Sequence, residues 1–182
     1  MAENGSKQAL VVVDVQVAVM AASIDAAEVI ERIGGLVERA RTTGVPVIWV
    51  RHNSDDLVPG TPEWQIVPEL APADGEPIVE KQFGDSFAET DLGERLAEVG
   101  ATSIVLCGAQ SDACIRSTFY GGIYRGFPMT LVGDAHTTED MSAWGVGYSP
   151  QQAIEMINMQ AQYTRLPGLS GMVVKAADMF AS

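Results

Sequence analysis

In the segment Gly108-Ala109-Gln110-Ser111-Asp112-Ala113-Cys114-Ile115-Arg116-Ser117-Thr118, an apolar run gives way to the start of an amphipathic one. Residues 103–107 before it are typical of a buried strand, and residues 115–125 are typical of a helix. Cys114 therefore lies in the first turn of the predicted helix, where free backbone N–H groups and the helix dipole favour negative charge. A thiol in that position can have its pKa drawn below its free value of about 8.5, so Cys114 is a candidate nucleophile.

Short apolar runs alternate with longer amphipathic segments along the chain. We expect six strands, at Ala9–Val13, Val45–Val50, Pro77–Val79, Ser103–Cys107, Met129–Val132 and Met172–Val174. Several of these runs are almost wholly apolar, which is typical of parallel strands covered on both faces. The helices between them have predicted stops at Gly44 and Gly100 and predicted caps at Thr90 and Ser149. This alternation predicts a single α/β domain over residues 1–182, a three-layer doubly wound sandwich around a mainly parallel six-stranded sheet.

Composition narrows the class of protein. With 182 residues, the chain is long enough to bury one sizeable hydrophobic core. Its formal net charge of −13 argues against a nucleic-acid surface. It has no apolar run of the ~20 residues needed to cross a membrane. The polar start lacks the apolar region of a signal peptide, and two cysteines do not make a disulfide framework, so we expect a cytoplasmic protein.

Three residues with useful chemistry come at the ends of predicted strands. Asp14 ends the first strand, Lys81 follows the third and Cys114 follows the fourth. Open α/β sheets bind ligands at the carboxyl ends of their strands, and the common strand order 3-2-1-4-5-6 would make Asp14 and Cys114 face each other across the crevice. Each residue also has an ordinary structural interpretation. The cysteine could be a small core residue, the aspartate a loop or cap residue and the lysine a solvated edge charge.

Four groups of residues occur in a characteristic order between residues 9 and 174. They are Val13-Asp14-Val15-Gln16, then Lys81 with Asp85-Ser86-Phe87 and Thr90, then Gly108–Cys114 with Thr118, and then Gly133-Asp134-Ala135. In this order and spacing the chain resembles the isochorismatase-like superfamily of cysteine hydrolases, which includes nicotinamidases, N-carbamoylsarcosine amidohydrolase and streptothricin hydrolase. The resemblance implies a Rossmann-like fold and a triad of the nucleophile Cys114, the general base Asp14 and the supporting cation Lys81. It also implies a non-proline cis peptide at Ala109–Gln110.

The chemistry of these residue types is consistent with that assignment. An aspartate alone is a poor base for a thiol, since their reference pKa values are about 3.9 and 8.5, so Lys81 and the helix terminus must favour the thiolate. Attack on a carbonyl would form an oxyanion and then an acyl-thioester that water hydrolyses. The backbone N–H groups of Cys114 and Ala113, beside the turn residues Ala109 and Gln110, are candidate oxyanion donors. We therefore expect hydrolysis of a C–N bond in a small amide, ureide or lactam.

A metal site is not expected. Nicotinamidases bind a metal through an Asp-x-His pair and a further histidine near the end of the second strand, whereas this chain has Val50-Arg51-His52-Asn53 there. A solitary His52 falls short of the three or four ligands of a zinc site. We therefore predict no metal and, without a nucleotide-binding motif, no cofactor. His52 is interpreted as a pocket-lining or structural residue.

The sequence defines the residues that contact the substrate less closely than it defines the triad. The candidate substrate-binding residues are Gln16, His52, Phe83, Tyr120 and Trp144, although the aromatic ones could equally pack in the core. Gln110 could line the pocket or merely occupy the turn. The aperiodic segment 53–76 and the segment 139–148 are expected to select the substrate. We expect a small-molecule substrate, no nucleic-acid or membrane partner and, from the family resemblance, a homo-oligomer (dimer or tetramer).

Other functions stay open from the sequence. The members that cleave isochorismate, a vinyl ether, need a proton donor and commonly lack the cysteine, so Asp14 could act as an acid with Cys114 incidental. The chain could instead be a catalytically silent binding relative. A redox pair of Cys107 and Cys114 is disfavoured because Cys107 lies within an apolar run. A Cys–His dyad with His136 is disfavoured because we expect His136 after the fifth strand, where it caps or packs a loop.

Overall fold

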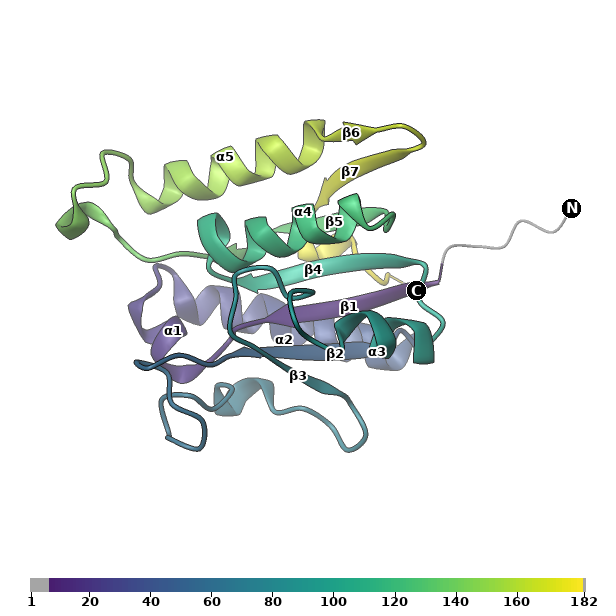
Figure 1. The fold of residues 1–182 in the computed structure, drawn as a ribbon, viewed down its shortest axis with the longest axis horizontal. Coiled ribbons are helices and arrows are strands. Elements are labelled where there is room, and N and C mark those ends of the chain that lie inside the picture. Colours follow the sequence, from purple (N-terminus) through teal and green to yellow (C-terminus); the bar gives the residue numbers. More distant parts are fainter. Residues whose placement is uncertain (1–6, 182) are drawn as a thin grey trace, which may run out of the picture.

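The computed structural model describes residues 7–181 and contains one sheet between two layers of helices (Figure 1). The sheet has seven strands in the order β3-β2-β1-β4-β5-β7-β6. All neighbouring strands are parallel except β6 and β7, which form an antiparallel pair. The strands are β1 (Gln8–Val13), β2 (Val47–His52), β3 (Ile78–Lys81), β4 (Ser103–Ala109), β5 (Met129–Thr137), β6 (Arg165–Leu166) and β7 (Leu169–Val174).

The seventh strand corrects the six-stranded sheet expected from the sequence. The added strand is β6, a pair of residues that forms a hairpin with β7 around Pro167 and Gly168. Gly168 has a φ of +76°, which suits a tight turn. Because β6 is too short to leave a periodic pattern, the sequence does not indicate it. The remaining strands have the expected order, with β7 as the sixth.

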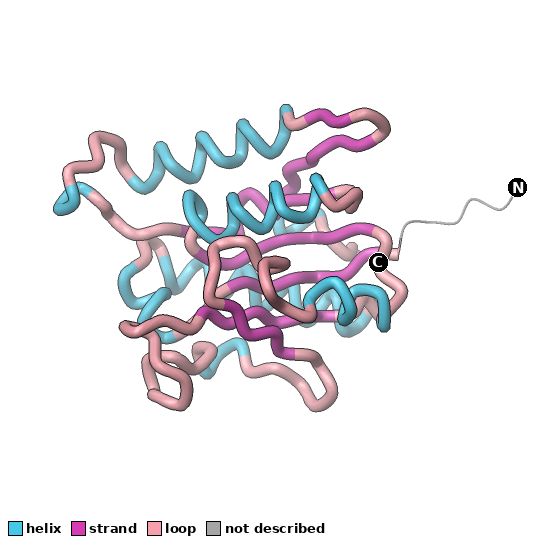
Figure 2. The backbone as a smooth tube through the Cα atoms, in the orientation of Figure 1, coloured by secondary structure: helices cyan, strands magenta, loops and turns pink. Residues whose placement is uncertain are grey.

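Helices cover both faces of the sheet, with α2 on one face and α3, α4 and α5 on the other (Figures 1 and 2). Alternate residues of β1 pack against opposite layers, Leu10 and Val12 with α2, and Val11 and Val13 with the other helices. The expected three-layer α/β sandwich is therefore confirmed. None of the helices in the described part of the chain is long and apolar enough to cross a membrane. The helices are α1 (Val17–Ala22), α2 (Ala26–Thr42), α3 (Leu92–Glu98), α4 (Arg116–Tyr124) and α5 (Pro150–Tyr163).

The starts of two helices follow the capping residues read from the sequence. Ser149 and Gln152 form a reciprocal capping box at the start of α5. The helix α3 begins one position later than the Thr90 cap predicts, after Asp91. Thr90 Oγ1 nevertheless accepts a hydrogen bond from the Leu92 N–H at 3.3 Å, so its side chain still caps a free backbone donor.

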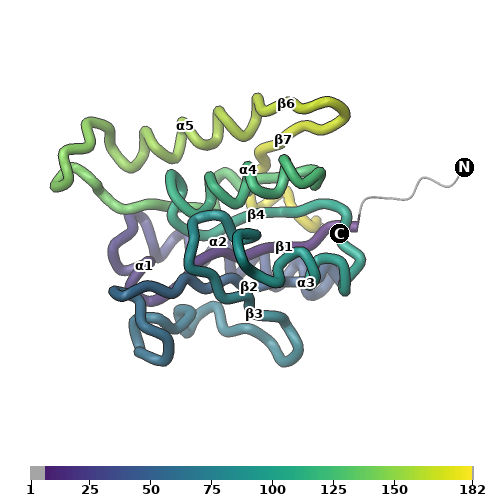
Figure 3. Tube along the Cα trace, in the orientation of Figure 1, coloured from purple at the N-terminus to yellow at the C-terminus, as the bar shows by residue number. Residues whose placement is uncertain are grey.

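The carboxyl ends of β1, β2, β3 and β4 lie at one edge of the sheet, because these strands are parallel neighbours (Figure 3). The long segment after β2, residues 53–76, is irregular apart from one short helical turn and an isolated bridge. Trp64 is buried within it and donates its indole N–H to Asn53 at 2.6 Å. The residues that follow these strands therefore share one edge of the molecule.

Candidate active site

Gly108 brings the ends of β1 and β4 close together. It lies opposite Val13 in the parallel register and has a φ of +122°. A Cβ atom at this position would overlap the backbone carbonyl of Val13, so any side chain would force the two strands apart. Because Gly108 has no side chain, the two strands can approach each other closely. Asp14, which follows β1, therefore lies close to the turn that carries Cys114.

The turn that carries Cys114 is a single π-helical turn, Ser111–Ile115, which continues directly into α4. The peptide bond between Ala109 and Gln110 before it is cis, as the family resemblance implies. The Ala113 N–H donates to the Gln110 carbonyl at 3.1 Å and is thus engaged within the turn. The Cys114 N–H, the other backbone donor expected to bind an oxyanion, lies in the same turn.

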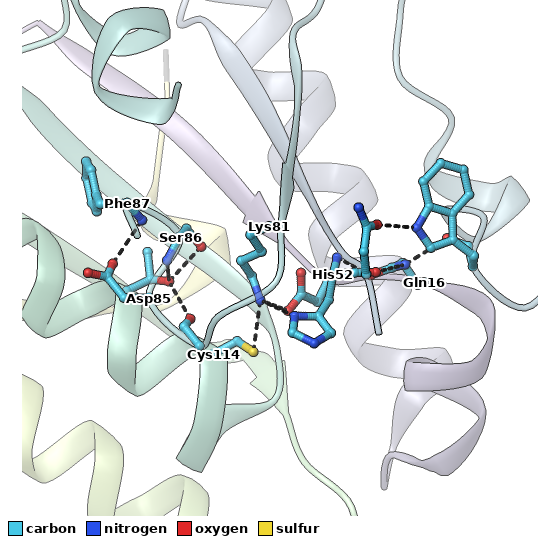
Figure 4. Close-up of polar contacts among 12 residues, drawn as sticks. Gln16, His52, Lys81, Asp85, Ser86, Phe87 and Cys114 are labelled. Carbon is cyan, nitrogen blue, oxygen red and sulfur yellow. Dashed lines mark hydrogen bonds and ion pairs between the residues drawn. The ribbon is translucent and has the colours of Figure 1, made fainter. Parts of the chain in front are cut away.

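Lys81, at the end of β3, connects three of the candidate residues (Figure 4). Its ammonium nitrogen lies 2.7 Å from Asp14 Oδ2, 3.0 Å from His52 Nδ1 and 3.1 Å from Cys114 Sγ. A lysine ammonium carries three N–H donors, so each donor has one acceptor. The Lys81 side chain is fully buried, and the negative charge of Asp14 compensates the buried positive charge.

Burial and charge act on the pKa values of these groups in opposite directions. Burial alone would lower the pKa of Lys81, but Asp14 and Cys114 beside it outweigh that effect and raise it. For Cys114, burial and the Asp14 charge raise the pKa of the thiol well above its ordinary value, although Lys81 opposes the shift. The expectation of a depressed thiol pKa is therefore wrong. Because desolvation and the Asp14 charge together outweigh the opposing effect of Lys81, the folded site favours the protonated thiol.

Asp14 uses only one of its carboxylate oxygens. Its Oδ2 pairs with Lys81, whereas its buried Oδ1 has no hydrogen-bond partner among residues 7–181. A buried polar atom left without a partner is costly and indicates a role in chemistry or ligand binding. Asp14 also has a φ of +52°, and such left-handed non-glycine residues cluster at active sites. Its Oδ1 is therefore available to accept a proton.

Gln16 fixes the position of His52. Its side-chain amide accepts from the His52 N–H at 2.7 Å and donates to the carbonyls of His52 at 3.1 Å and Trp64 at 2.8 Å. Gln16 is fully buried and does not line the cavity beside Cys114, so it has a positioning task instead of the expected substrate contact. Burial and the Lys81 charge lower the pKa of His52, which keeps its Nδ1 available as an acceptor at neutral pH.

The residues at this site do not fit a metal ion. Ligand atoms of Asp14, His52 and Cys114 lie within 4.8 Å of one another, a spacing that a metal ion could bridge. The Lys81 ammonium, however, already lies within hydrogen-bonding distance of all three residues. A cation among these atoms repels a metal ion, and it already takes one lone pair from each of the three side chains.

A cavity of about 350 Å³ reaches the candidate triad. This volume suits a small organic molecule. Five residues singled out in the sequence line the cavity, namely Asp14, His52, Gln110, Ala113 and Cys114. Lys81 does not line the cavity but contacts three of these side chains, those of Asp14, His52 and Cys114.

Both segments expected to select the substrate contribute to the cavity wall. Asp56 and Leu57 come from the segment after β2, and Glu139 comes from the segment after β5. The helix α1 adds the small apolar side chains of Ala18 and Val19. The sequence indicates the two segments but not these residues, because a segment without periodicity does not show which of its side chains point inward.

The three aromatic candidates lie elsewhere. Tyr120 on α4 packs against the core and stacks on Tyr124, with 6.0 Å between the ring centroids. The side chains of Phe83 and Trp144 are 48% and 78% exposed, and none of the three lines the described cavity. Their positions match the ordinary packing or surface roles of aromatic side chains.

His136 has a different place from the one expected. It lies inside β5, which continues past its apolar run. After a register shift in the pairing of β4 with β5, His136 pairs with Gly108 of β4. The His136 ring is buried, with Nδ1 2.7 Å from Ser111 Oγ and Nε2 3.0 Å from Asn158 Oδ1. It therefore connects the turn of Cys114 to α5 and supports the turn from the side. The prediction that His136 follows the strand is wrong.

The chain is similar to known proteins in sequence and in fold. The Isochorismatase domain family matches residues 8–165. A streptothricin hydrolase from Streptomyces noursei is 38% identical over 145 residues, which cover 75% of this chain and 51% of that protein. An N-carbamoylsarcosine amidase from Arthrobacter sp is 28% identical over 131 residues, which cover 58% of this chain and 50% of that protein. The chain thus spans about half the length of the curated relatives it matches.

A solved structure has the same fold over nearly the whole chain. It is a cysteine hydrolase from Pseudomonas syringae pv. phaseolicola 1448A with a TM-score of 0.84 and 24% sequence identity, and the match covers 96% of this chain and 91% of that one. The family match covers both the strand that precedes Asp14 and the turn that carries Cys114. The chain therefore belongs to the isochorismatase family.

Proposed function

We propose that the protein hydrolyses a C–N bond in a small amide, ureide or lactam, with Cys114 as nucleophile, Asp14 as general base and Lys81 as supporting cation. The observation that carries this proposal is the Lys81 ammonium, 2.7 Å from Asp14 Oδ2 and 3.1 Å from Cys114 Sγ, beside a cavity. The names of two relatives, a streptothricin hydrolase and an N-carbamoylsarcosine amidase, support this reaction class.

Attack on the substrate starts from a protonated thiol. Because burial keeps the proton on Cys114, Asp14 must accept it as the sulfur bonds to the substrate carbonyl carbon. Asp14 Oδ1, which has no partner among the described residues, is the oxygen suited to receive it. Lys81 stabilises the negative charge that develops on the sulfur. The carbonyl oxygen becomes an oxyanion and accepts a hydrogen bond from the Cys114 N–H.

Collapse of the tetrahedral intermediate breaks the C–N bond. The nitrogen leaves with the proton held by Asp14, and the acyl group stays on Cys114 as a thioester. A water molecule then attacks the thioester carbonyl carbon while Asp14 accepts one of its protons. Cleavage of the C–S bond returns that proton to Cys114 and releases the carboxylic acid, so both residues regain their starting states.

The substitution Cys114→Ala tests the nucleophile. Wild-type enzyme and variant are compared for ammonia or amine release from a panel of amides, ureides and lactams that includes N-carbamoylsarcosine and streptothricin. We expect a loss of at least about 10³-fold in kcat/KM for the variant. Cys107→Ala is the matched control, because it removes the other cysteine, which is fully buried in β4, and should keep most of the turnover. A thioester adduct on Cys114 in quenched samples would support the covalent step.

Two outcomes would contradict the proposal. Full turnover by Cys114→Ala would exclude a thioester and favour ether cleavage with Asp14 as an acid. A folded wild-type protein that hydrolyses no member of the panel, yet binds some of them, would favour a silent binding relative.

We also propose that the protein is a cytoplasmic homo-oligomer. Cys107 and Cys114 are both free thiols, which persist in a reducing compartment. The family resemblance is the basis for a dimer or tetramer. Sedimentation velocity at micromolar concentration measures the assembly directly, and a monomer would contradict this part of the proposal.

A further inference from the structure

The cavity beside Cys114 has acidic side chains in its wall, and His52 is the one titratable nitrogen base among the described residues that line it. Asp56 and Glu139 come from different segments, one after β2 and one after β5. Among the described residues that line this cavity, none is a lysine or an arginine. The third carboxylate, Asp14, is compensated by Lys81. Asp56 and Glu139 therefore set the charge that an entering molecule meets.

The basic side chains beside His52 are committed to other partners. Each of the three N–H donors of Lys81 already has an acceptor. Arg51, the residue before His52, does not line the cavity. Its guanidinium lies over the Trp64 ring at 3.6 Å and pairs with Glu80 at 2.7 Å, while its buried Nε has no partner among the described residues. An anionic group on the substrate would therefore lose its hydration in the cavity without gaining a cationic partner, which is unfavourable.

The carboxylates offer acceptors to a ligand that carries donors. Asp14 is 2% exposed, lines the cavity and has an Oδ1 atom without a partner in the described chain. Glu139 accepts one hydrogen bond, from the side-chain amide of Gln110 at 3.0 Å. Asp56 is exposed and has no ion pair with any residue in the range 7–181. Such a lining matches a group with several N–H donors and a positive charge.

We propose that the substrate is a cationic amide, that is, a small amide, ureide or lactam that also carries a protonated amine or guanidinium group bound by Asp56 and Glu139. This inference rests on the proposed function for the position of the scissile carbonyl at Cys114. The net charge of −13 adds a long-range field that attracts cations. The carbon skeleton of the substrate would meet the apolar part of the lining, Ala18, Val19, Ala22 and Leu57.

The charge of the cavity can be measured without any substrate. Cys114 is modified with two methanethiosulfonates of similar size, one with a trimethylammonium group and one with a sulfonate, and both rates are followed by mass spectrometry. The ratio of the two rates is divided by the same ratio for 2-mercaptoethanol, which removes the intrinsic reactivity of the reagents. We expect this corrected ratio to favour the cationic reagent by about tenfold, and to fall by about threefold in Glu139→Gln and in Asp56→Asn.

Asp74→Asn is the matched control for this measurement. It removes the same charge from an exposed residue before β3, at the opposite edge of the sheet, so the corrected ratio should stay unchanged. A wild-type ratio near one would overturn the proposal. A ratio that neither cavity variant changes, or that Asp74→Asn lowers as much as they do, would overturn it as well.

Three amides of similar size extend the test to turnover. At neutral pH, β-alaninamide is cationic, butyramide is neutral and succinamate is anionic. We expect kcat/KM to decrease in that order, and Glu139→Gln to narrow the gap between β-alaninamide and succinamate by about threefold, mainly through KM. A preference for succinamate overturns the proposal. If none of the three is hydrolysed while the corrected rate ratio favours the cation, the amide chemistry fails and the cationic ligand stays supported.

Discussion

The two histidines of the chain belong to two polar clusters that differ in charge and in access to the cavity. His52 ends β2 and His136 lies in β5, so the two histidines lie on either side of β1 and β4. The cluster that we propose to be catalytic, called the catalytic cluster below, consists of Asp14, His52, Lys81 and Cys114. It contains an ion pair, and all of its members except Lys81 line the cavity. The support cluster is formed of neutral side chains around a ring that is 2% exposed and consists of Ser111, His136 and Asn158.

From this difference we infer that the two clusters have separate tasks at one edge of the sheet, chemistry in the first and stability in the second. The catalytic cluster keeps a buried charge and an unpartnered oxygen, Asp14 Oδ1, both of which are costly to maintain. In the support cluster, both ring nitrogens of His136 have partners, so burial of the ring is compensated. We therefore expect substitutions in the catalytic cluster to abolish turnover, and substitutions in the support cluster to lower stability first.

The largest effect is expected for Lys81→Met. Turnover should fall by at least about 10³-fold, because the thiolate and the Asp14 carboxylate lose their cation. The free energy of unfolding should fall by about 3–5 kcal/mol, because Asp14 is left buried without a counter-charge. In the double variant Asp14→Asn/Lys81→Met, most of the stability should return while turnover stays absent. Urea unfolding and kcat/KM measure the two quantities separately.

This double variant is the sharpest check of the catalytic cluster. If the second substitution does not recover stability, the Asp14–Lys81 pair is not the source of the loss. If the double variant turns over substrate, neither residue takes part in the chemistry, and the contrast between the clusters fails.

The second effect is expected for His136→Leu in the support cluster. The free energy of unfolding should fall by about 1–3 kcal/mol, because Ser111 and Asn158 lose their buried partner. At a temperature where the variant is folded, kcat should stay within about tenfold of the wild type, because the catalytic cluster is intact. A folded His136→Leu variant as inactive as Lys81→Met would place His136 in the chemistry.

The sequence predicts the catalytic cluster better than the support cluster, for a physical reason. Asp14, Lys81 and Cys114 each follow an apolar strand, and the carboxyl ends of parallel strands meet at one edge whatever their detailed register. The contact between His52 and Lys81 depends on register, since these two residues are paired across β2 and β3. Periodicity does not reveal this register, because β3 has only four residues, too few to define its alignment with β2.

Burial is the other quantity that the sequence does not contain. The Cys114 thiol follows a helix start, which predicts a lowered pKa, but its position inside the folded site raises the pKa instead. The polar end of β5 likewise gives no apolar run, so His136 is not recognised as a strand residue. Tyr120 is placed on a helix correctly, but the direction in which its ring points follows from the packing of α4.

The third effect concerns His52 and the third N–H of Lys81. His52→Leu removes one acceptor and leaves a buried ammonium hydrogen without a partner, so we expect kcat to fall by about tenfold with little change in KM. His52→Asn retains an acceptor on a short side chain and should recover part of the loss. Steady-state kinetics of the two variants measures this difference. A change confined to KM, or equal kcat values for the two variants, would show that His52 contacts the substrate and does not orient Lys81.

The smallest effect concerns the protons on the two histidines. Burial lowers the pKa of His136, and burial together with the Lys81 charge lowers that of His52, so the folded state favours the neutral form of both. An unfolded chain protonates each histidine near the ordinary pKa of about 6.5. Below that pH the unfolded state therefore binds more protons, and the free energy of unfolding falls by at most about 1.4 kcal/mol per pH unit for each proton. Above it, the contribution of both neutral rings is fully present.

Urea unfolding of the wild type and of histidine variants between about pH 5 and 8 measures the two contributions. The carboxylates are the same in all of these proteins, so their contribution cancels in the difference between wild type and variant. The difference between wild type and His136→Gln should shrink as the pH falls, because the variant has no ring to protonate in the unfolded state. His52→Asn should show a smaller change, since His52 is only half-buried beside an open cavity. If both variants lose stability with acid as steeply as the wild type, burial does not keep either ring neutral, and the contrast between an open and a sealed cluster fails.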